Sequence, residues 1–245
     1  MSKNIDQLNK KGFFVANLLN KSDVKKILEE IKKIYFFNKK NSSLDKHISI
    51  LYKKDPILAG KCYDSLNQSA VIQKIFLSNK VLNNVAKYLG LKTKSLITFA
   101  DFQFLVMLPK KKTEHLGWHQ DSRYFEFTKN KRSSLILWTS IGSQGKKINS
   151  SLSIMPGSHN LGRIMHEKNK IKKIKKTKKI KRGRFYINLD QLKKFKAENY
   201  FISSGQSLVF DSNLVHRTGP STKGNNSIRY TMIARYKNIN KILNS

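Results

Sequence analysis

Cysteine is almost absent from this sequence, and so are long apolar runs. The single cysteine, Cys62, excludes an internal disulfide and is typical of proteins in a reducing compartment, so we predict a cytoplasmic location. Residues 1–7 contain no apolar stretch of the kind that a secretory signal needs. No uncharged run is long enough to cross a bilayer, and we therefore expect no transmembrane segment.

Acidic residues are the second shortage. The chain has 15 Asp and Glu against 49 Lys and Arg, which gives a formal net charge of +34. An excess of this size is typical of proteins that bind nucleic acid or an anionic membrane. Lysine, asparagine and isoleucine are nevertheless abundant along the whole chain, as AT-rich coding would make them, and lysine far outnumbers the arginine that base readers usually need. We therefore favour compositional bias over a dedicated polyanion site.

The 245 residues suit a single domain, residues 1–245, in which the pattern changes once. Residues 1–95 are predicted to be mainly helical, because apolar residues recur at helical spacing over residues 24–34 and 56–89. The polar stretch at residues 39–55 predicts a loop. Over residues 96–236, short apolar runs separated by turns predict strands. Strands after a helical front end favour a mostly β fold with flanking α-helices, a jelly roll.

One segment departs from this pattern. Nearly every second residue from Lys168 to Arg184 is basic. Dense like charge favours extended, solvated chain, so we interpret this segment as an insertion, near 168–184, that protrudes from the barrel. The alternative is a contact for an acidic partner. No aromatic residue of the kind that stacks on bases interrupts the run, so nucleic acid ranks low among partners.

The most informative stretch is Gly-Trp-His-Gln-Asp at residues 117–121. His119 and Asp121 are two residues apart, a spacing that puts both side chains on one face of a strand. His216, much further along the chain, can supply a second imidazole. Two histidines and one carboxylate on one face of an iron, with open positions, are the ligand set of non-haem Fe(II) oxygenases. We therefore predict a catalytic metal site at His119, Asp121 and His216.

Three other histidines compete for this role. His115 lies in a polar turn just before the motif, and His166 borders the lysine-rich segment. His159 ends a Pro-Gly-Ser-His turn, where a hydrogen bond to the backbone suits it better than metal ligation. We rank all three below His119 and His216 as metal ligands.

Three blocks of the sequence together resemble the phytanoyl-CoA dioxygenase-like family of Fe(II)/2-oxoglutarate oxygenases. The first block is residues 117–121. The second, residues 149–162, is similar to the family's Asn-Gly-x-Leu…Pro-Gly-Ser-His turn, with Ser150 where glycine is usual. The third is His-Arg-Thr-Gly-Pro at residues 216–220, followed by Arg229. The order and rough separation of the blocks also agree with the family, and the resemblance covers most of the chain.

The resemblance implies a double-stranded β-helix, the cupin-like jelly roll, with Fe(II) held by His119, Asp121 and His216. The co-substrate 2-oxoglutarate would chelate the iron through its 1-carboxylate and 2-keto oxygen. Arg229 would bind the far carboxylate of the co-substrate, because a guanidinium binds a carboxylate through two parallel hydrogen bonds.

Three further residues are candidates for co-substrate or substrate contacts. Thr218 lies two residues beyond His216, so it can face the same way and offer a hydroxyl donor. Gln103 is polar within an apolar strand, and Trp138 lies on a strand between Leu137 and Thr139. Relatives use residues on these strands for such contacts. An outward-facing Gln103 and a core Trp138 are equally compatible with the sequence.

The implied activity is a dioxygenase reaction that consumes O2 and 2-oxoglutarate, releases succinate and CO2, and hydroxylates a small-molecule or carrier-linked substrate. Related halogenases carry a small residue where this chain has Asp121, so the carboxylate favours hydroxylation over halogenation. The sequence does not identify the substrate, and an anionic one is left open. The competing hypothesis is a basic protein that binds nucleic acid or an anionic surface through residues 168–184.

Overall fold

The computed structural model describes residues 3–36, 43–108, 117–125, 133–142, 150–168, 185–220 and 228–240. The helices in these ranges are α1 (Lys3–Lys11), α2 (Lys21–Tyr35), α3 (Leu44–Lys54), α4 (Pro56–Asn67), α5 (Ala70–Phe76), α6 (Asn79–Leu89) and α7 (Ser122–Phe125). The strands are β1 (Phe13–Asn17), β2 (Ile97–Met107), β3 (Ser134–Gly142), β4 (Ser150–Ile154), β5 (Glu167–Lys168), β6 (Phe185–Tyr186), β7 (Glu198–Ile202), β8 (Gln206–Asp211), β9 (His216–Thr218) and β10 (Arg229–Asn238).

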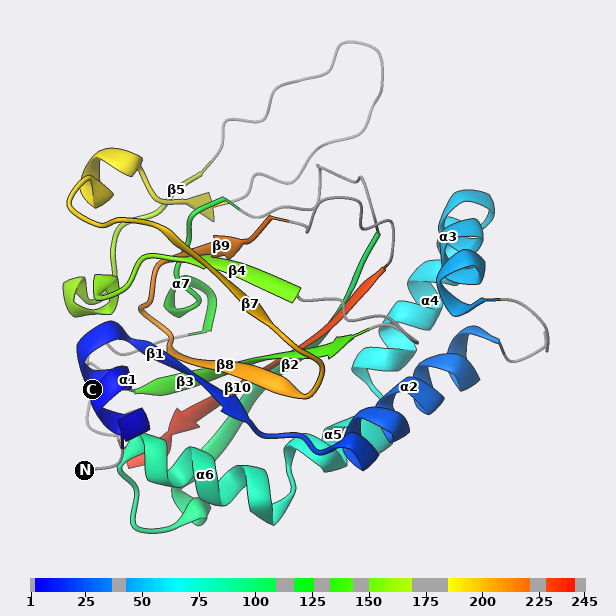
Figure 1. Cartoon of the computed structure of the whole chain (residues 1–245), viewed down its shortest axis with the longest axis horizontal. Coiled ribbons are helices and arrows are strands. Elements are labelled where there is room, and N and C mark those ends of the chain that lie inside the picture. The colour runs from blue at the N-terminus through cyan, green and yellow to red at the C-terminus, as the bar shows by residue number, and fades with distance from the viewer. Residues whose placement is uncertain are drawn as a thin grey trace.

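The strands form two main antiparallel sheets that face each other (Figure 1). The larger sheet has the order β1-β8-β3-β10-β2, and the smaller has the order β7-β4-β9. Apolar side chains from the inner faces of both sheets pack into one cluster, which includes Trp138 and Phe210 from the larger sheet and Leu152 and Ile154 from the smaller. This cluster fills the space between the sheets.

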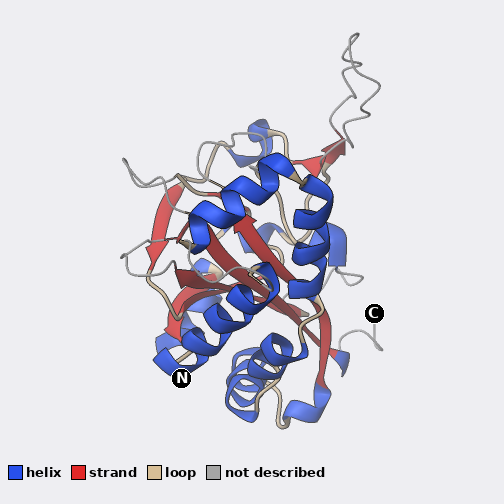
Figure 2. Ribbon diagram, turned by 90° about the vertical axis from the view of Figure 1, so that its right-hand side faces the viewer, coloured by secondary structure: helices blue, strands red, loops and turns tan. Residues whose placement is uncertain are grey.

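Helices α2 to α6 cover the other face of the larger sheet (Figures 1 and 2). Their ends are set by local sequence signals. Asn20 caps α2, because its side chain accepts from the backbone N–H of Asp23 while the Asp23 side chain accepts from the N–H of Asn20. Gly90 ends α6 with a φ of 70°, a conformation that glycine adopts without strain. The apolar stripes of these helices form the main core together with the outer face of the sheet.

Helix α4 also protects the open edge of the larger sheet. Strand β2 lies at that edge, and its Phe104 N–H donates to Oδ1 of Asn67 at the end of α4 over 2.6 Å. Nearby, Nε2 of Gln103 lies 3.4 Å from the hydroxyl of Tyr63. The helical front end therefore supplies side-chain partners to a strand that would otherwise expose unpaired backbone groups.

The structure confirms antiparallel sheets with flanking helices and corrects two predictions. The described helices hold more residues than the described strands, so the fold is not mostly β. The loop predicted at residues 39–55 is wrong where α3 lies, at Leu44–Lys54. Leu44 and Ile48 are buried, and Leu51 packs against the same core, so a helical stripe was present among the polar residues. The lysine-rich segment falls almost entirely outside the described residues, and its protrusion stays a prediction. Within the described ranges, no helix is both long and apolar enough to span a membrane.

Candidate metal centre

The two predicted histidine ligands lie side by side, although 97 positions separate them in the sequence. His119 and His216 form an isolated antiparallel bridge in which each backbone N–H donates to the other's carbonyl over 3.0 Å. His216 is the first residue of β9, so the bridge attaches the 117–121 segment to the free edge of the smaller sheet. Asp121 follows two residues later and turns toward the same point.

The three side chains converge on a buried site. The Nε2 atoms of His119 and His216 lie 3.7 Å and 3.6 Å from Oδ1 of Asp121. One nitrogen or oxygen atom from each residue lies within 4.8 Å of the others, which is compact enough for one metal ion. All three residues are buried, so solvent does not compete for these atoms.

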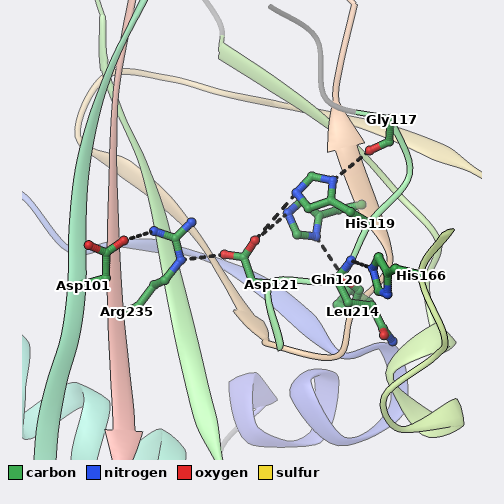
Figure 3. Close-up of polar contacts among 9 residues, drawn as sticks. Asp101, Gly117, His119, Gln120, Asp121, His166, Leu214 and Arg235 are labelled. Atoms are coloured by element: carbon green, nitrogen blue, oxygen red, sulfur yellow. Dashed lines mark hydrogen bonds and ion pairs between the residues drawn. The ribbon is translucent and has the colours of Figure 1, made fainter. Parts of the chain in front are cut away.

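Each imidazole is oriented by a carbonyl two residues before it. Nδ1 of His119 lies 2.8 Å from the carbonyl oxygen of Gly117, and Nδ1 of His216 lies 2.9 Å from that of Leu214 (Figure 3). A carbonyl only accepts, so each Nδ1 carries the hydrogen and donates it. The Nε2 lone pairs are therefore left facing Asp121, as a metal ligand requires.

The electrostatics of the site give each group the protonation state that ligates. Burial, and after it the nearby His216, lower the pKa of His119 to about 4 against the opposing effect of Asp121. Burial lowers the pKa of His216 as well. Burial disfavours ionisation of Asp121, but the guanidinium of Arg235 and the two histidines outweigh it, and the pKa of Asp121 falls to about 2. At neutral pH the site has two neutral imidazoles and one carboxylate.

Arg235 pairs directly with one member of the triad. Its Nε donates to Oδ2 of Asp121 over 2.8 Å, and its Nη1 donates to Oδ2 of Asp101 over 2.8 Å (Figure 3). Arg235 lies on β10 directly opposite Asp101 on β2. Asp121 is thereby attached to the larger sheet, whereas His216 belongs to the smaller sheet and His119 is bridged to it.

Gln120, between His119 and Asp121 in the sequence, points its side chain away from both and is fully buried (Figure 3). Its Nε2 donates to the carbonyls of Gly162 and Asn213, and its Oε1 accepts from the N–H of Ile164. Its backbone N–H donates to Nε2 of His166 (Figure 3). Gln120 therefore fixes the 117–121 segment against two loops, one of which leads into β9.

The structure separates the rival histidines from the site. His166 uses Nε2 as the acceptor for Gln120, on the side opposite the triad. His159 has its Nε2 3.1 Å from the carbonyl oxygen of Asn9, the backbone role predicted for it. Gly12 makes this approach possible, because a Cβ there would lie 2.5 Å from Nδ1 of His159. His115 lies outside the described residues.

Arg229, the predicted anchor of the co-substrate, faces the space between the sheets. It starts β10, and alternation places it on the same face as Arg235 six residues later. Arg229 is 6% exposed, and burial lowers its pKa. No other described residue makes a hydrogen bond or ion pair with its guanidinium. A buried guanidinium without a partner is costly, which is consistent with a place reserved for an anion.

The three further candidates for co-substrate or substrate contacts, Gln103, Trp138 and Thr218, face the same space between the sheets. Gln103 and Trp138 flank Ile233 of β10 in register, one on each side, and therefore share its inward face. Trp138 belongs to the apolar cluster between the sheets, as the core interpretation expected. Thr218 is half-buried, two residues after His216 on β9. Their contacts with a ligand stay predictions.

Three contributors to the site escaped the sequence interpretation: Asp101, Arg235 and Gln120. Asp101 carried no signal, because its role depends on the pairing of β10 with β2. Arg235 did carry a signal, since it lies an even number of residues after Arg229 on the same strand and therefore faces the same side. Gln120 was also missed, and its position between two ligands was the only available hint.

The fold is similar to those of several solved structures. One is AviO1 from Streptomyces viridochromogenes Tue57, at 14% identity and a TM-score of 0.58, with 96% of this chain and 93% of that chain covered. Another is EvdO2 from Micromonospora carbonacea var. aurantiaca complexed with 2-oxoglutarate, at 12% identity and a TM-score of 0.60, with 97% and 91% covered.

A third similar structure is described as the epimerase SnoN in complex with Fe3+, alpha ketoglutarate and nogalamycin RO. It is 12% identical with a TM-score of 0.60, and 96% of this chain and 82% of that chain are covered. At such identities the likeness concerns the fold alone. No curated protein sequence matches the chain.

The family is decided by a sequence model instead. The model of the phytanoyl-CoA dioxygenase family matches residues 8–227, which include every metal-ligand candidate and every described strand except β10. This match agrees with the three blocks that carried the resemblance. The chain therefore belongs to the phytanoyl-CoA dioxygenase (PhyH) family.

Proposed function

We propose that this protein is an Fe(II)- and 2-oxoglutarate-dependent dioxygenase whose metal is held by His119, Asp121 and His216. The observation that carries the proposal is the convergence of two neutral imidazoles and one ionised carboxylate on a single buried point. Membership of the PhyH family supports it. So do the similar structures described as complexes with 2-oxoglutarate or with Fe3+ and alpha ketoglutarate.

Two arginines fit the charge of the co-substrate. Arg235 pairs with two carboxylates, Asp101 and Asp121, so this trio keeps one negative charge, and Asp121 would also ligate the metal. Arg229 then compensates the remaining negative charge of that trio from the other end of the same strand face. The two positive charges of Fe(II) match the two negative charges of 2-oxoglutarate. With metal and co-substrate bound, these named groups sum to neutrality, which suits a buried site.

The co-substrate would lie along β10, with its keto acid end at the metal and its far carboxylate on Arg229. Thr218, Gln103 and Trp138 would line the same interior as co-substrate or substrate contacts. When bound, Fe(II) supplies the redox chemistry by which O2 and 2-oxoglutarate give succinate and CO2. The residues of this chain would orient the metal ligands, exclude water and bind the 2-oxoglutarate dianion.

We propose hydroxylation of a small-molecule or carrier-linked substrate as the outcome. The carboxylate at Asp121 occupies the position that halogenases leave to a small residue. SnoN, which has a similar fold, is described as an epimerase, so the fold alone does not choose between hydroxylation and epimerisation. The basic binding hypothesis concerns residues 168–184, mostly outside the described chain, and no described feature favours it.

We also assign the two sheets to a double-stranded β-helix and residues 1–245 to one catalytic domain. The larger and smaller sheets share an apolar cluster, and the family model runs through helices and strands alike. The cytoplasmic location stays a prediction from the cysteine content.

The test is an anaerobic titration of the protein with Fe(II) and 2-oxoglutarate, followed by the visible charge-transfer absorption of the chelate. We expect the band in the wild type and its loss in His119→Ala and His216→Ala. His47→Gln is the matched control, because this histidine lies on α3 and contacts Tyr35 and Phe36 instead of the triad. Formation of the band in both Ala variants would refute the assigned ligands. Succinate release in a substrate screen would then identify the reaction.

A further inference from the structure

We propose that Arg235 is a positioning residue that keeps Asp121 a one-oxygen metal ligand. The inference rests on the proposed function, since it concerns the metal of that site. It adds a role for Arg235, which the predicted ligand set does not include. The argument starts from how the two oxygens of one carboxylate are used.

The Asp121 carboxylate is divided between two partners. Its Oδ1 faces the two imidazoles, at 3.7 Å from Nε2 of His119 and 3.6 Å from Nε2 of His216. Its Oδ2 accepts from Nε of Arg235 over 2.8 Å. A carboxylate whose second oxygen is bound by a guanidinium in this way presents only one oxygen to a metal.

This division matters for the number of open positions. A two-histidine, one-carboxylate triad occupies three positions of a six-coordinate iron when each residue gives one atom. The three others then serve the two donor atoms of a chelating 2-oxo acid and one further small ligand. If both oxygens of Asp121 bound the metal, the position for the small ligand would be lost.

The fold holds Arg235 in place from the opposite side. Nη1 of Arg235 donates to Oδ2 of Asp101 over 2.8 Å, and the two residues are direct partners across β10 and β2. The register between these strands shifts immediately after this pair, between Arg235 and Tyr236. Irregularities of this kind re-aim side chains next to active sites. Arg235 is 5% exposed, so its geometry is fixed by these contacts.

An arginine is suited to this task in a way that a lysine is not. Arg235 uses Nε toward one carboxylate and Nη1 toward the other, so two donors in a rigid plane fix the angle between Asp121 and Asp101. A lysine ammonium carries the charge on one flexible atom. A lysine at position 235 would compensate the negative charge of the carboxylates without fixing which oxygen of Asp121 faces the metal.

The experiment uses Co(II) as the probe, because its d–d absorption reports coordination number. In Arg235→Met, we expect the spectrum to shift to that of a higher coordination number, as the freed oxygen of Asp121 joins the metal. Nitric oxide binding to the anaerobic Fe(II)–2-oxoglutarate complex should weaken by about tenfold or more, in the range that partners of metal ligands typically contribute. Arg235→Lys should recover part of both effects.

Arg217→Met is the matched control. Arg217 directly follows the ligand His216 but is exposed and stacks on Trp118, with its guanidinium carbon 4.5 Å from the ring centroid. Its loss should leave the Co(II) spectrum unchanged. If Arg235→Met does not fold, Asp101→Asn removes one anchor of Arg235 and should shift the spectrum in the same direction by less.

Two results would overturn the inference, and they are distinguishable. Failure of the wild type to bind Co(II) would reject the proposed metal site itself. A wild type that binds Co(II), with an identical spectrum in every folded Arg235 or Asp101 variant, would leave the metal site intact and reject the role of Arg235 alone.

Discussion

Strand β10 is buried on both faces, and the two faces differ in chemistry. Its outer face packs against the helices through Tyr230, Met232, Ala234 and Tyr236. Its inner face carries Arg229, Thr231 and Arg235 toward the space between the sheets. Because successive side chains of a strand point to opposite faces, β10 presents alternate residues to the main core and to the candidate metal centre.

The difference between the faces lies in how their polar atoms are satisfied. On the outer face, the hydroxyl of Tyr236 donates to the carbonyl of Phe76, and that of Tyr230 donates to Asp45. On the inner face, the buried hydroxyl of Thr231 has no partner among the described residues, and the buried guanidinium of Arg229 makes no hydrogen bond or ion pair with a described residue. Satisfied polar atoms stabilise the fold, whereas unpaired buried ones cost stability and are retained where a ligand pairs with them.

The largest expected effect that tests this difference is Arg229→Ala. Because charge-assisted pairing of a buried guanidinium is worth a few kcal/mol, the 2-oxoglutarate requirement should rise by roughly two orders of magnitude, or about 2.8 kcal/mol. The free energy of unfolding should not fall, since the folded protein pairs this charge with no described residue. The measurements are 2-oxoglutarate dependence of the chelate absorption and urea unfolding.

The control for Arg229→Ala is a co-substrate without a far carboxylate. Binding of 2-oxobutyrate should be equal in the wild type and the variant, because it chelates the metal but offers nothing for Arg229. Arg229→Lys should rescue 2-oxoglutarate binding only in part. An unchanged 2-oxoglutarate requirement in Arg229→Ala would assign the far carboxylate to another cation.

On the outer face, Tyr236→Phe should lower the free energy of unfolding by about 1–2 kcal/mol at neutral pH, because the carbonyl of Phe76 loses its donor. Burial raises the pKa of Tyr236 far above its ordinary value. Above about pH 10 the unfolded chain ionises this phenol while the folded chain keeps it protonated. The unfolded state then binds fewer protons, so the contribution of Tyr236 is lost as pH rises, by about 1.4 kcal/mol per pH unit.

The measurement is urea unfolding of the wild type and Tyr236→Phe from about pH 8 to about pH 11, a range that spans the ordinary tyrosine pKa. The stability difference should be constant below about pH 9.5 and should shrink above it. Taking the difference cancels the titration of the many lysines. A difference that stays constant to the highest pH would mean that Tyr236 ionises in the folded protein.

The smallest expected effect is that of Thr231→Val on stability. Thr231 is fully buried, yet its hydroxyl has no described partner, so replacing it by a methyl group removes an unpaired polar atom. We expect the free energy of unfolding to stay the same or rise by up to about 1 kcal/mol. Urea unfolding beside Tyr236→Phe compares the two hydroxyls directly. A loss above about 1 kcal/mol would show that the inner face is satisfied in the folded protein.

Much of the metal centre was predictable because its signals are local. The two-residue spacing of His119 and Asp121 predicts a shared face on any strand, and the structure brings both together with His216. The ends of α2 and α6 are set by signals that are equally local, namely the reciprocal Asn20–Asp23 hydrogen bonds and Gly90. The loop error over α3 arose because the few apolar residues there are separated by charged and polar ones, although their helical spacing was present.

The sequence by itself determined the ligand types, their order and the alternation that puts Arg229 and Arg235 on one face of a strand. Only the tertiary structure decided that Asp101 holds Arg235, and that Arg235 in turn binds one oxygen of Asp121. The physical reason is that spacing within an element is fixed by backbone geometry, whereas strand order and register depend on which distant segments pair. The partner of Asp121 was therefore set by the antiparallel pairing of β10 with β2.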